Sequence, residues 1–259
     1  MDLHLTGKRV LITGASKGIG LAAAWSFARE GCDLCLTARS ADLLADNANA
    51  IGTTTGVAVD VFPADLRSAD DRGRLVDACG DIDILVNNAG DVPGGSLDRL
   101  DDEAWRAGWE LKVFGYIDMT RRMYSRMRER GRGVIINDIG AAGERFDAGY
   151  IAGSTGNAAL MTFTRALGAR SLDEGVRVLG VNPGLVATDR SVMMLRAMAA
   201  SRFGDADRVD DVLARFPGGR CATPEEIADA MVFLASERSA HTSGVILTID
   251  GGFCAAGGQ

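Results

Sequence analysis

A glycine-rich stretch near the start of the chain has the residue types and spacing that bind phosphate. It reads Thr13-Gly14-Ala15-Ser16-Lys17-Gly18-Ile19-Gly20, between an apolar run at 10–12 and a helical pattern at 21–29. Glycine lets the backbone turn sharply and approach a pyrophosphate, and free N–H groups at the start of the helix attract an anion. The position between a strand and a helix is the context that this motif requires. We predict a nucleotide site with contacts from Gly14, Ser16, Lys17, Gly18, Ile19 and Gly20.

Two basic residues near this turn indicate which nucleotide binds there. Lys17 lies within the turn, and Arg39 follows an apolar run at 34–37 with no carboxylate before Asp42. A carboxylate at that point suits the free ribose hydroxyl of NAD, whereas cations suit the 2′-phosphate of NADP. Each charged hydrogen bond contributes roughly 1.5–3 kcal/mol, so two give a strong preference. We predict NADP (NADPH) as the cofactor; the alternative is that both residues are ordinary surface cations.

The elements that must position these residues alternate between apolar strands and amphipathic helices. We predict strands at 10–12, 34–37, 57–61, 82–86, 133–139, 176–181 and 245–249, and helices at 21–29, 42–51, 70–79, 100–130, 154–172 and 224–236, with Thr223 as the N-cap of the last. This alternation implies an α/β protein with a parallel sheet covered on both faces. Ligands of such sheets bind beyond the carboxyl ends of the strands, where the irregular segments 140–149 and 188–219 fall.

Composition excludes several classes of function. The chain has 259 residues, of which 47% are hydrophobic, and a formal charge of −7, which argues against a nucleic-acid partner. It contains no apolar run of the roughly 20 residues that a membrane helix needs. The first ten residues contain no apolar signal core, so we expect a cytoplasmic protein. The cysteines show no zinc-like clustering and predict no metal site, and Cys32 and Cys35 fit buried core thiols better than a redox pair.

Six short motifs are spread over nearly the whole chain. They are TGASKGIG at 13–20, ADL at 64–66, ILVNNAG at 84–90, NPG at 182–184 with Thr188, PEEIA at 224–228 and DGG at 250–252. In this order and spacing they resemble the motifs of the short-chain dehydrogenase/reductase family. The resemblance implies one Rossmann-type three-layer domain over residues 1–259, with a seven-stranded parallel sheet and a bound nicotinamide dinucleotide. It also implies a homotetramer or dimer.

The same resemblance implies further cofactor contacts. Asp65 and Leu66 are expected beside the adenine, and Lys17 and Arg39 match the basic positions of NADP-preferring members. The remaining contacts, on the ribose, pyrophosphate and nicotinamide, are expected from Asn87, Asn88, Gly90, Pro183, Gly184, Val186 and Thr188.

The catalytic positions of the family carry other residues here. Typical members have a serine after the fifth strand, a tyrosine and a lysine four apart on the next helix, and an asparagine on the earlier long helix. A register anchored on Ala158-Ala159-Leu160 places Gly140, Gly153, Asn157 and Lys112 at these four positions, respectively. A second register, anchored on Tyr150 with Ser154 four residues later, restores a tyrosine but no lysine.

Four residues are therefore our candidates for catalysis: Tyr150, Lys112, Asn157 and Ser154. A buried lysine has a lowered pKa and can exchange a proton near neutrality, so Lys112 is the most informative; the alternative is a lysine that reaches solvent. Tyr150 can direct its hydroxyl toward the site or simply pack on a loop. Asn157 can bind the nicotinamide ribose. Asp138 lies on a strand expected to be buried and needs a partner, for which Lys112 is one possibility.

Three functions remain open from the sequence. The first is an NADP(H)-dependent oxidoreductase with a non-standard proton-transfer group or a substrate that needs no alcohol proton. The second is a non-redox enzyme of the elimination or dehalogenation type, and the third is an NADP(H)-binding regulator without turnover. We expect residues 188–219 to form a substrate lid. Its methionines favour a bulky apolar or aromatic substrate, or else an interface or core.

Overall fold

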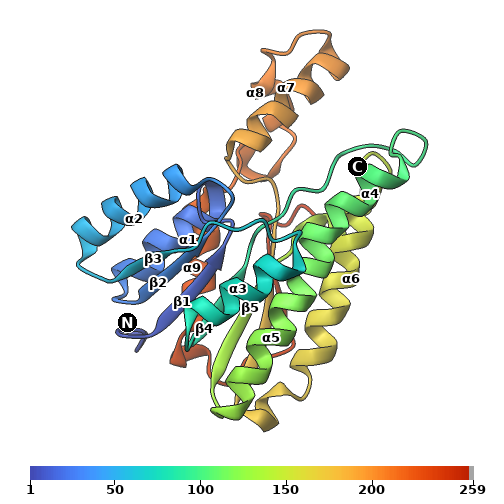
Figure 1. The fold of residues 1–259 in the computed structure, drawn as a ribbon. Helices are drawn as coiled ribbons and strands as arrows, with labels where there is room; N and C mark the ends of the chain where they lie inside the picture. Colours follow the sequence, from blue (N-terminus) through green and yellow to red (C-terminus); the bar gives the residue numbers. More distant parts are fainter. Residues whose placement is uncertain (257–259) are drawn as a thin grey trace.

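Seven parallel strands form the centre of the computed structural model, which describes residues 1–256 (Figure 1). The strands are β1 (Arg9–Thr13), β2 (Asp33–Thr37), β3 (Val59–Val61), β4 (Ile84–Asn87), β5 (Gly133–Asp138), β6 (Val176–Pro183) and β7 (Ile246–Ile249). Their order across the sheet is β3-β2-β1-β4-β5-β6-β7. This confirms the predicted Rossmann-type α/β fold with a single seven-stranded sheet.

Helices cover both faces of the sheet (Figure 1). One face is covered by α1 (Gly18–Arg29), α2 (Ala41–Thr55) and α9 (Pro224–Ala235), and the other by α3 (Ala69–Cys79), α5 (Gly115–Glu129) and α6 (Ile151–Gly168). Alternate side chains of a strand point to opposite faces, so Val10 and Ile12 join one apolar cluster and Leu11 the other. Burial on both faces explains why the strands are continuous apolar runs.

The direction of the strand order reverses between β1 and β4. From β1 the chain proceeds outward through β2 to β3 and then returns to β4 on the other side of β1. Loops that leave β1 and β4 therefore diverge at the carboxyl edge of the sheet, where α/β proteins of this kind bind ligands. The glycine-rich turn follows β1 at this point, as the sequence predicts.

The predicted helix at 100–130 is interrupted. It consists of α4 (Asp102–Trp109), a π-helical turn η1 (Glu110–Phe114) and α5. The π turn is closed by the Gly115 N–H, which donates to the Glu110 carbonyl five residues earlier. A π turn inserts one extra residue and often marks a functional site. Lys112 lies at its centre. The helix predicted at 154–172 instead spans α6, with Tyr150 as its N-cap, and a 3₁₀ helix η3 (Ser171–Glu174) follows it.

Two helices in the expected lid project from the body above the carboxyl edge (Figure 1). They are α7 (Asp189–Phe203) and α8 (Val209–Leu213), which share a small core of Leu195, Ala199 and Val212. The side chains of Met193, Met194 and Met198 are exposed. The segment is therefore held by its own apolar contacts and keeps part of its methionine surface open.

Local details confirm two smaller predictions. Thr223 caps α9 and accepts a hydrogen bond from the Glu226 N–H, completing a capping box. Cys32 and Cys35 are free buried thiols, and burial raises the pKa of Cys32 to about 12. No helix within residues 1–256 has the length and hydropathy that a membrane span requires.

Candidate active site

A cleft of about 1070 Å³ lies at the carboxyl edge of the sheet. Its wall is formed by the turn after β1, the ends of β2, β4 and β5, the π turn and the start of α7. The volume and the strand-end position suit an extended ligand of dinucleotide size.

The glycine-rich turn forms the floor of this cleft. A Cβ atom on Gly14 would lie 2.8 Å from Asn88 Nδ2, and one on Gly20 would lie 2.4 Å from the Gly14 carbonyl oxygen. Gly14 and Gly18 also have φ angles of 69° and 59°. Only glycine fits these positions, and α1 begins at Gly18, so that Gly18 and Ile19 at its N-terminus line the cleft.

Neighbouring side chains lock the turn in place. Asn88 Nδ2 donates to the carbonyl oxygens of Thr13 (2.7 Å) and Gly14 (3.2 Å), and Asn47 Nδ2 on α2 donates to that of Ser16 (3.0 Å). Thr13 Oγ1 accepts from the backbone N–H groups of Asn88 and Ala89. The turn is therefore rigid before any ligand arrives, which lowers the entropic cost of binding.

One end of the cleft is basic. Lys17, Arg39 and Ser40 line it, and both cations are exposed. Within residues 1–256 neither forms an ion pair. This end can hold a phosphate beyond the one at the glycine-rich turn, as the 2′-phosphate of NADP requires.

Most of the predicted cofactor residues line the cleft, and some lie behind it. The cleft wall includes Gly14, Ser16, Lys17, Gly18, Ile19, Arg39, Asp65, Leu66, Asn88, Gly90 and Thr188. Outside the lining are Gly20, Asn87, Asn157, Pro183, Gly184 and Val186. Asn87 is buried and donates to Thr120 on α5 and to Asn137 on β5, so in this structure it joins the end of β4 to both neighbours.

Lys112 is the one catalytic candidate on the cleft wall. Its Nζ atom donates to the carbonyl oxygens of Ile139 (2.6 Å) and Asp138 (3.3 Å), at the end of β5. A Cβ atom on Gly90 would lie 2.8 Å from Lys112 Cδ, so the glycine makes room for the lysine. Burial lowers the pKa of Lys112. The negative charge of Asp138 opposes this shift, and the positive charge of Arg190 adds to it.

Asp138 is a buried carboxyl group on the same part of the wall. Burial raises its pKa to about 6, although the charge of Lys112 opposes the shift. The predicted pairing with Lys112 takes a different form, because the lysine donates to the Asp138 backbone oxygen. A titratable carboxyl beside a lysine of lowered pKa is typical of a functional site.

Asn157 and Ser154 hold the frame of the site and do not line the cleft. Asn157 Nδ2 donates to the Gly140 carbonyl (3.2 Å), so Lys112 and Asn157 together bind three consecutive carbonyls at the end of β5 and just beyond it. Ser154 Oγ accepts from the Asp147 N–H (3.3 Å) and fixes the loop before α6.

Tyr150 fills space beside α6. A Cβ atom on Gly153 would lie 2.0 Å from the Cε1 and Cζ atoms of the Tyr150 ring, so the ring occupies the volume where a side chain at position 153 would begin. The phenol faces Arg190 and Asp91. Burial raises its pKa, and the Arg190 charge opposes this shift.

The far end of the cleft is completed by residues that the sequence analysis did not name, together with Met193 of the expected lid. Asp91, Val92 and Pro93 follow β4, and Arg190 and Met193 come from α7. Arg190 lies 3.6 Å from the Asp91 carboxylate and donates to the Val92 carbonyl, so it joins the lid to the body. The sequence signal that could have identified Asp91 and Arg190 is their position just after the motifs at 84–90 and 182–188.

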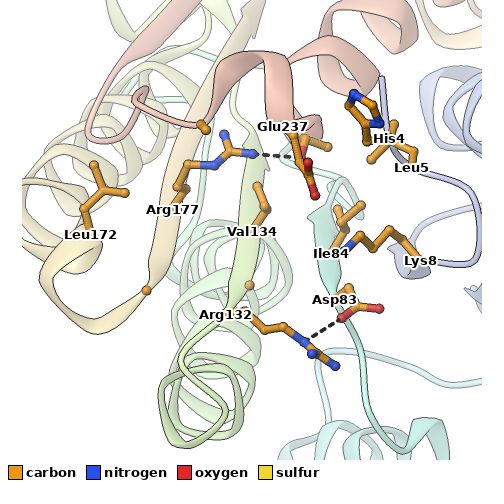
Figure 2. A pocket seen from close by; sticks show the side chains of 14 residues that line it. His4, Leu5, Lys8, Asp83, Ile84, Arg132, Val134, Leu172, Arg177 and Glu237 are labelled. Atoms are coloured by element: carbon orange, nitrogen blue, oxygen red, sulfur yellow. Dashed lines mark hydrogen bonds and ion pairs between the residues drawn. The ribbon is translucent and has the colours of Figure 1, made fainter. Parts of the chain in front are cut away.

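A second cavity, of about 210 Å³, lies at the opposite edge of the sheet (Figure 2). His4, Lys8, Arg132 and Arg177 line it, together with Glu237. Arg177 is buried there and donates to the carbonyl oxygens of Leu234, Ala235 and Ser236. Its guanidinium group therefore caps the C-terminal end of α9. Because this cavity lies at the amino ends of the strands, the large cleft is the candidate active site.

Comparisons with known proteins agree with this geometry. Residues 14–254 match the family model described as enoyl-(acyl carrier protein) reductase. The chain is 33% identical to the 3-oxoacyl-[acyl-carrier-protein] reductase of Escherichia coli over 257 residues (96% of this chain, 98% of the relative). It is 30% identical to the acetoacetyl-CoA reductase of Allochromatium vinosum over 247 residues (93% and 96%). The L-sorbose reductase of Gluconobacter frateurii, solved with NADPH and L-sorbose, superposes with a TM-score of 0.90 at 33% identity (97% and 98%).

Proposed function

Because the chain belongs to the short-chain dehydrogenase/reductase family, we propose that it is an NADP(H)-dependent carbonyl reductase in which Lys112 supplies the proton. The observation that carries this proposal is the position of the Lys112 ammonium group on the cleft wall, anchored by two carbonyl oxygens. The usual serine, tyrosine and lysine are replaced by Gly140, Gly153 and Asn157.

NADP(H) is the cofactor, and the residues of the cleft fit it. The glycines at 14 and 20 leave a cradle that a side chain would fill, and Lys17 and Arg39 are free to bind the 2′-phosphate. When bound, the cofactor supplies the hydride for reduction. The protein must hold the substrate carbonyl and provide one proton to its oxygen.

Lys112 has the hydrogen-bonding capacity for this step. An ammonium group has three N–H donors, and the carbonyls of Asp138 and Ile139 take two of them. The third can donate to a substrate oxygen and transfer its proton as the carbonyl becomes an alcohol. The neutral amine then regains a proton from water. The lowered pKa of Lys112 favours this exchange near neutral pH.

The rest of the remodelled site supports this role. Asn157 holds the backbone at Gly140, and the Tyr150 ring closes the space beside Gly153. Residues 188–219 act as the substrate lid, with Met193 on the cleft wall, which suits an apolar or aromatic substrate. Self-association into a dimer or homotetramer stays a prediction that analytical ultracentrifugation checks.

A substrate screen with two lysine variants tests the proposal. NADPH oxidation is followed at 340 nm with ketones, activated alkenes and halogenated compounds, and NADPH affinity is measured by fluorescence. Lys112→Met should lower the rate about 10²–10⁴-fold. Lys8→Met, at the opposite edge of the sheet, should leave it unchanged. Full activity in Lys112→Met would reject the assignment of Lys112.

Two other outcomes of the screen reject the reductase itself. Tight NADPH binding without oxidation by any compound favours the NADP(H)-binding regulator. Product formation with no change in the cofactor favours the non-redox enzyme.

A further inference from the structure

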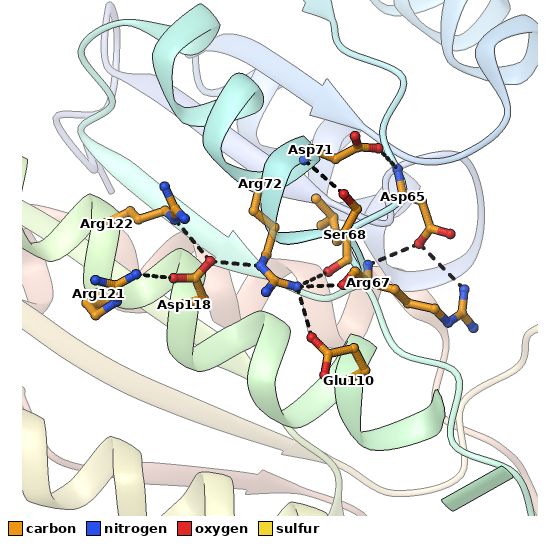
Figure 3. A network of polar contacts seen from close by, with 10 residues as sticks. Asp65, Arg67, Ser68, Asp71, Arg72, Glu110, Asp118, Arg121 and Arg122 are labelled. Atoms are coloured by element: carbon orange, nitrogen blue, oxygen red, sulfur yellow. Dashed lines mark hydrogen bonds and ion pairs between the residues drawn. The ribbon is translucent and has the colours of Figure 1, made fainter. Parts of the chain in front are cut away.

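The π turn that presents Lys112 adjoins a partly buried ion-pair network centred on Arg72 and Asp118 (Figure 3). π-Helical turns are rare and occur mostly as single-turn bulges inside α-helices, often at functional sites. The first residue of this turn, Glu110, lies 3.5 Å from Arg72 Nη1 on α3. Arg72 has only 5% of its surface exposed, so its guanidinium group is enclosed by the protein.

Arg72 binds three separate segments with one guanidinium group. Its Nη1 atom donates to the carbonyl oxygens of Leu66 (2.6 Å) and Arg67 (3.1 Å), in the loop after β3. Its Nε atom donates to Asp118 on α5 (2.8 Å). Figure 3 shows Arg72 between Asp118 and the backbone beside Arg67, with Glu110 below it.

Asp118 remains an anion over the whole working range of pH. Burial opposes its ionisation, but hydrogen bonds from Arg121, Arg72 and Arg122 lower its pKa to about 2. The contact between α3 and α5 is therefore a lasting charge pair, and the guanidinium is held in a fixed orientation.

The loop and the π turn that Arg72 joins belong to the two ends of the cleft. Asp65 and Leu66 line the cleft near its basic end, and Lys112 lines its far end. The two segments also lie side by side, because a Cβ atom added to Gly115, the C-cap of the π turn, would lie 3.5 Å from the Leu66 carbonyl oxygen. Leu66 and Leu111 share one apolar cluster.

We propose that Arg72 is a positioning residue that holds the adenosine-binding loop and the Lys112-bearing π turn in a single arrangement. The proposal rests on the proposed function for the importance of Lys112, but its structural content is separate. Loss of the guanidinium should displace both segments together, since one group fixes both.

The matched control is Arg126, which joins the same two helices at their other end. Its Nη1 atom donates to the Val76 carbonyl (2.7 Å), and Nη2 pairs with Asp77 (2.7 Å). Arg126 contacts neither the loop after β3 nor the π turn. Arg72→Met and Arg126→Met therefore both loosen α3 against α5, and only the first should alter the cleft.

Two readouts that need no turnover test the proposal. Calorimetry with adenosine 2′,5′-bisphosphate reports the adenosine end alone. Carbon-13 NMR of protein labelled at lysine Cε reports Lys112, because the chain has only two other lysines, Lys8 and Lys17. Arg72→Met should weaken binding of the bisphosphate roughly tenfold or more and shift the Lys112 signal, and Arg72→Lys should restore both in part. Arg126→Met should change neither.

Glu110→Ala provides a second variant in case Arg72→Met does not fold. Glu110 has a partly exposed side chain, and its loss should shift the Lys112 signal while bisphosphate affinity stays within twofold. Three results would overturn the proposal. Arg72→Met could leave both bisphosphate binding and the Lys112 signal unchanged, or Arg126→Met could have the same effects as Arg72→Met. The third is a Lys112 signal that does not shift in Glu110→Ala. A Lys112→Met protein with full activity would instead reject the proposed function and leave these results standing.

Discussion

The crowding between Gly153 and Tyr150 predicts an unusual response to a single methyl group. In Gly153→Ala the new Cβ would lie 2.0 Å from two atoms of the Tyr150 ring, whereas non-bonded carbons prefer about 3.5–4.0 Å. The ring must move by about 1.5 Å or more to relieve this contact. Overpacking of this kind costs about 1–3 kcal/mol.

In a Tyr150→Ala background, the change in the free energy of unfolding caused by Gly153→Ala should have the opposite sign. The three atoms nearest to the added Cβ all belong to the Tyr150 ring and are then absent. Alanine is favoured over glycine within a helix by about 0.5–1 kcal/mol, so Gly153→Ala should stabilise this protein. The preference for alanine is common to both backgrounds, so the difference between them equals the overpacking cost of about 1–3 kcal/mol, which is above the error of the measurement.

Urea unfolding of the four proteins, followed by circular dichroism, measures this difference. Gly52→Ala on α2 is the control, because its added Cβ would meet ordinary contacts of 3.5 Å or more. It should stabilise both backgrounds by the same amount. Equal effects of Gly153→Ala in the two backgrounds would refute the placement of the Tyr150 ring beside Gly153.

Two further predictions concern the ends of the cleft. Arg39→Ala should reduce the preference for NADPH over NADH roughly tenfold or more in fluorescence titrations, and equal affinities of the unaltered protein would contradict the assignment of the 2′-phosphate site. The Asp138 charge raises the pKa of Lys112, so Asp138→Asn should lower that pKa. A proton donor must be protonated, so the alkaline fall of the pH–rate profile should begin at lower pH; an unmoved profile, or the same shift in Asp91→Asn, would contradict this.

The cofactor half of the site could be predicted because it depends on local backbone geometry. Glycines at 14, 18 and 20 leave a pattern in the sequence, and their conformation and crowding follow directly from the turn. Lys17 and Arg39 sit at fixed offsets from strand ends. Each prediction needed only the residues of one strand–turn–helix unit.

The other half depends on contacts between segments that are distant in the chain. No sequence pattern marks the π turn that directs Lys112 into the cleft, and Arg190 reaches the site from α7. Asn87 matches a motif, yet its side chain is buried at the end of β4 and hydrogen-bonded to Thr120 and Asn137. Tyr150 reaches its position because Gly153 has no side chain, which sequence spacing alone does not reveal.

The central claim is that Lys112 delivers the proton in an NADPH-dependent reduction. Its most direct test is a single-turnover measurement with NADPH that carries deuterium at both C4 positions and a carbonyl substrate from the screen. The unaltered protein should yield an alcohol that carries deuterium, and Lys112→Met should do so about 10²–10⁴ times more slowly at similar NADPH affinity. Equal rates in the two proteins, or an alcohol without deuterium, would contradict the account.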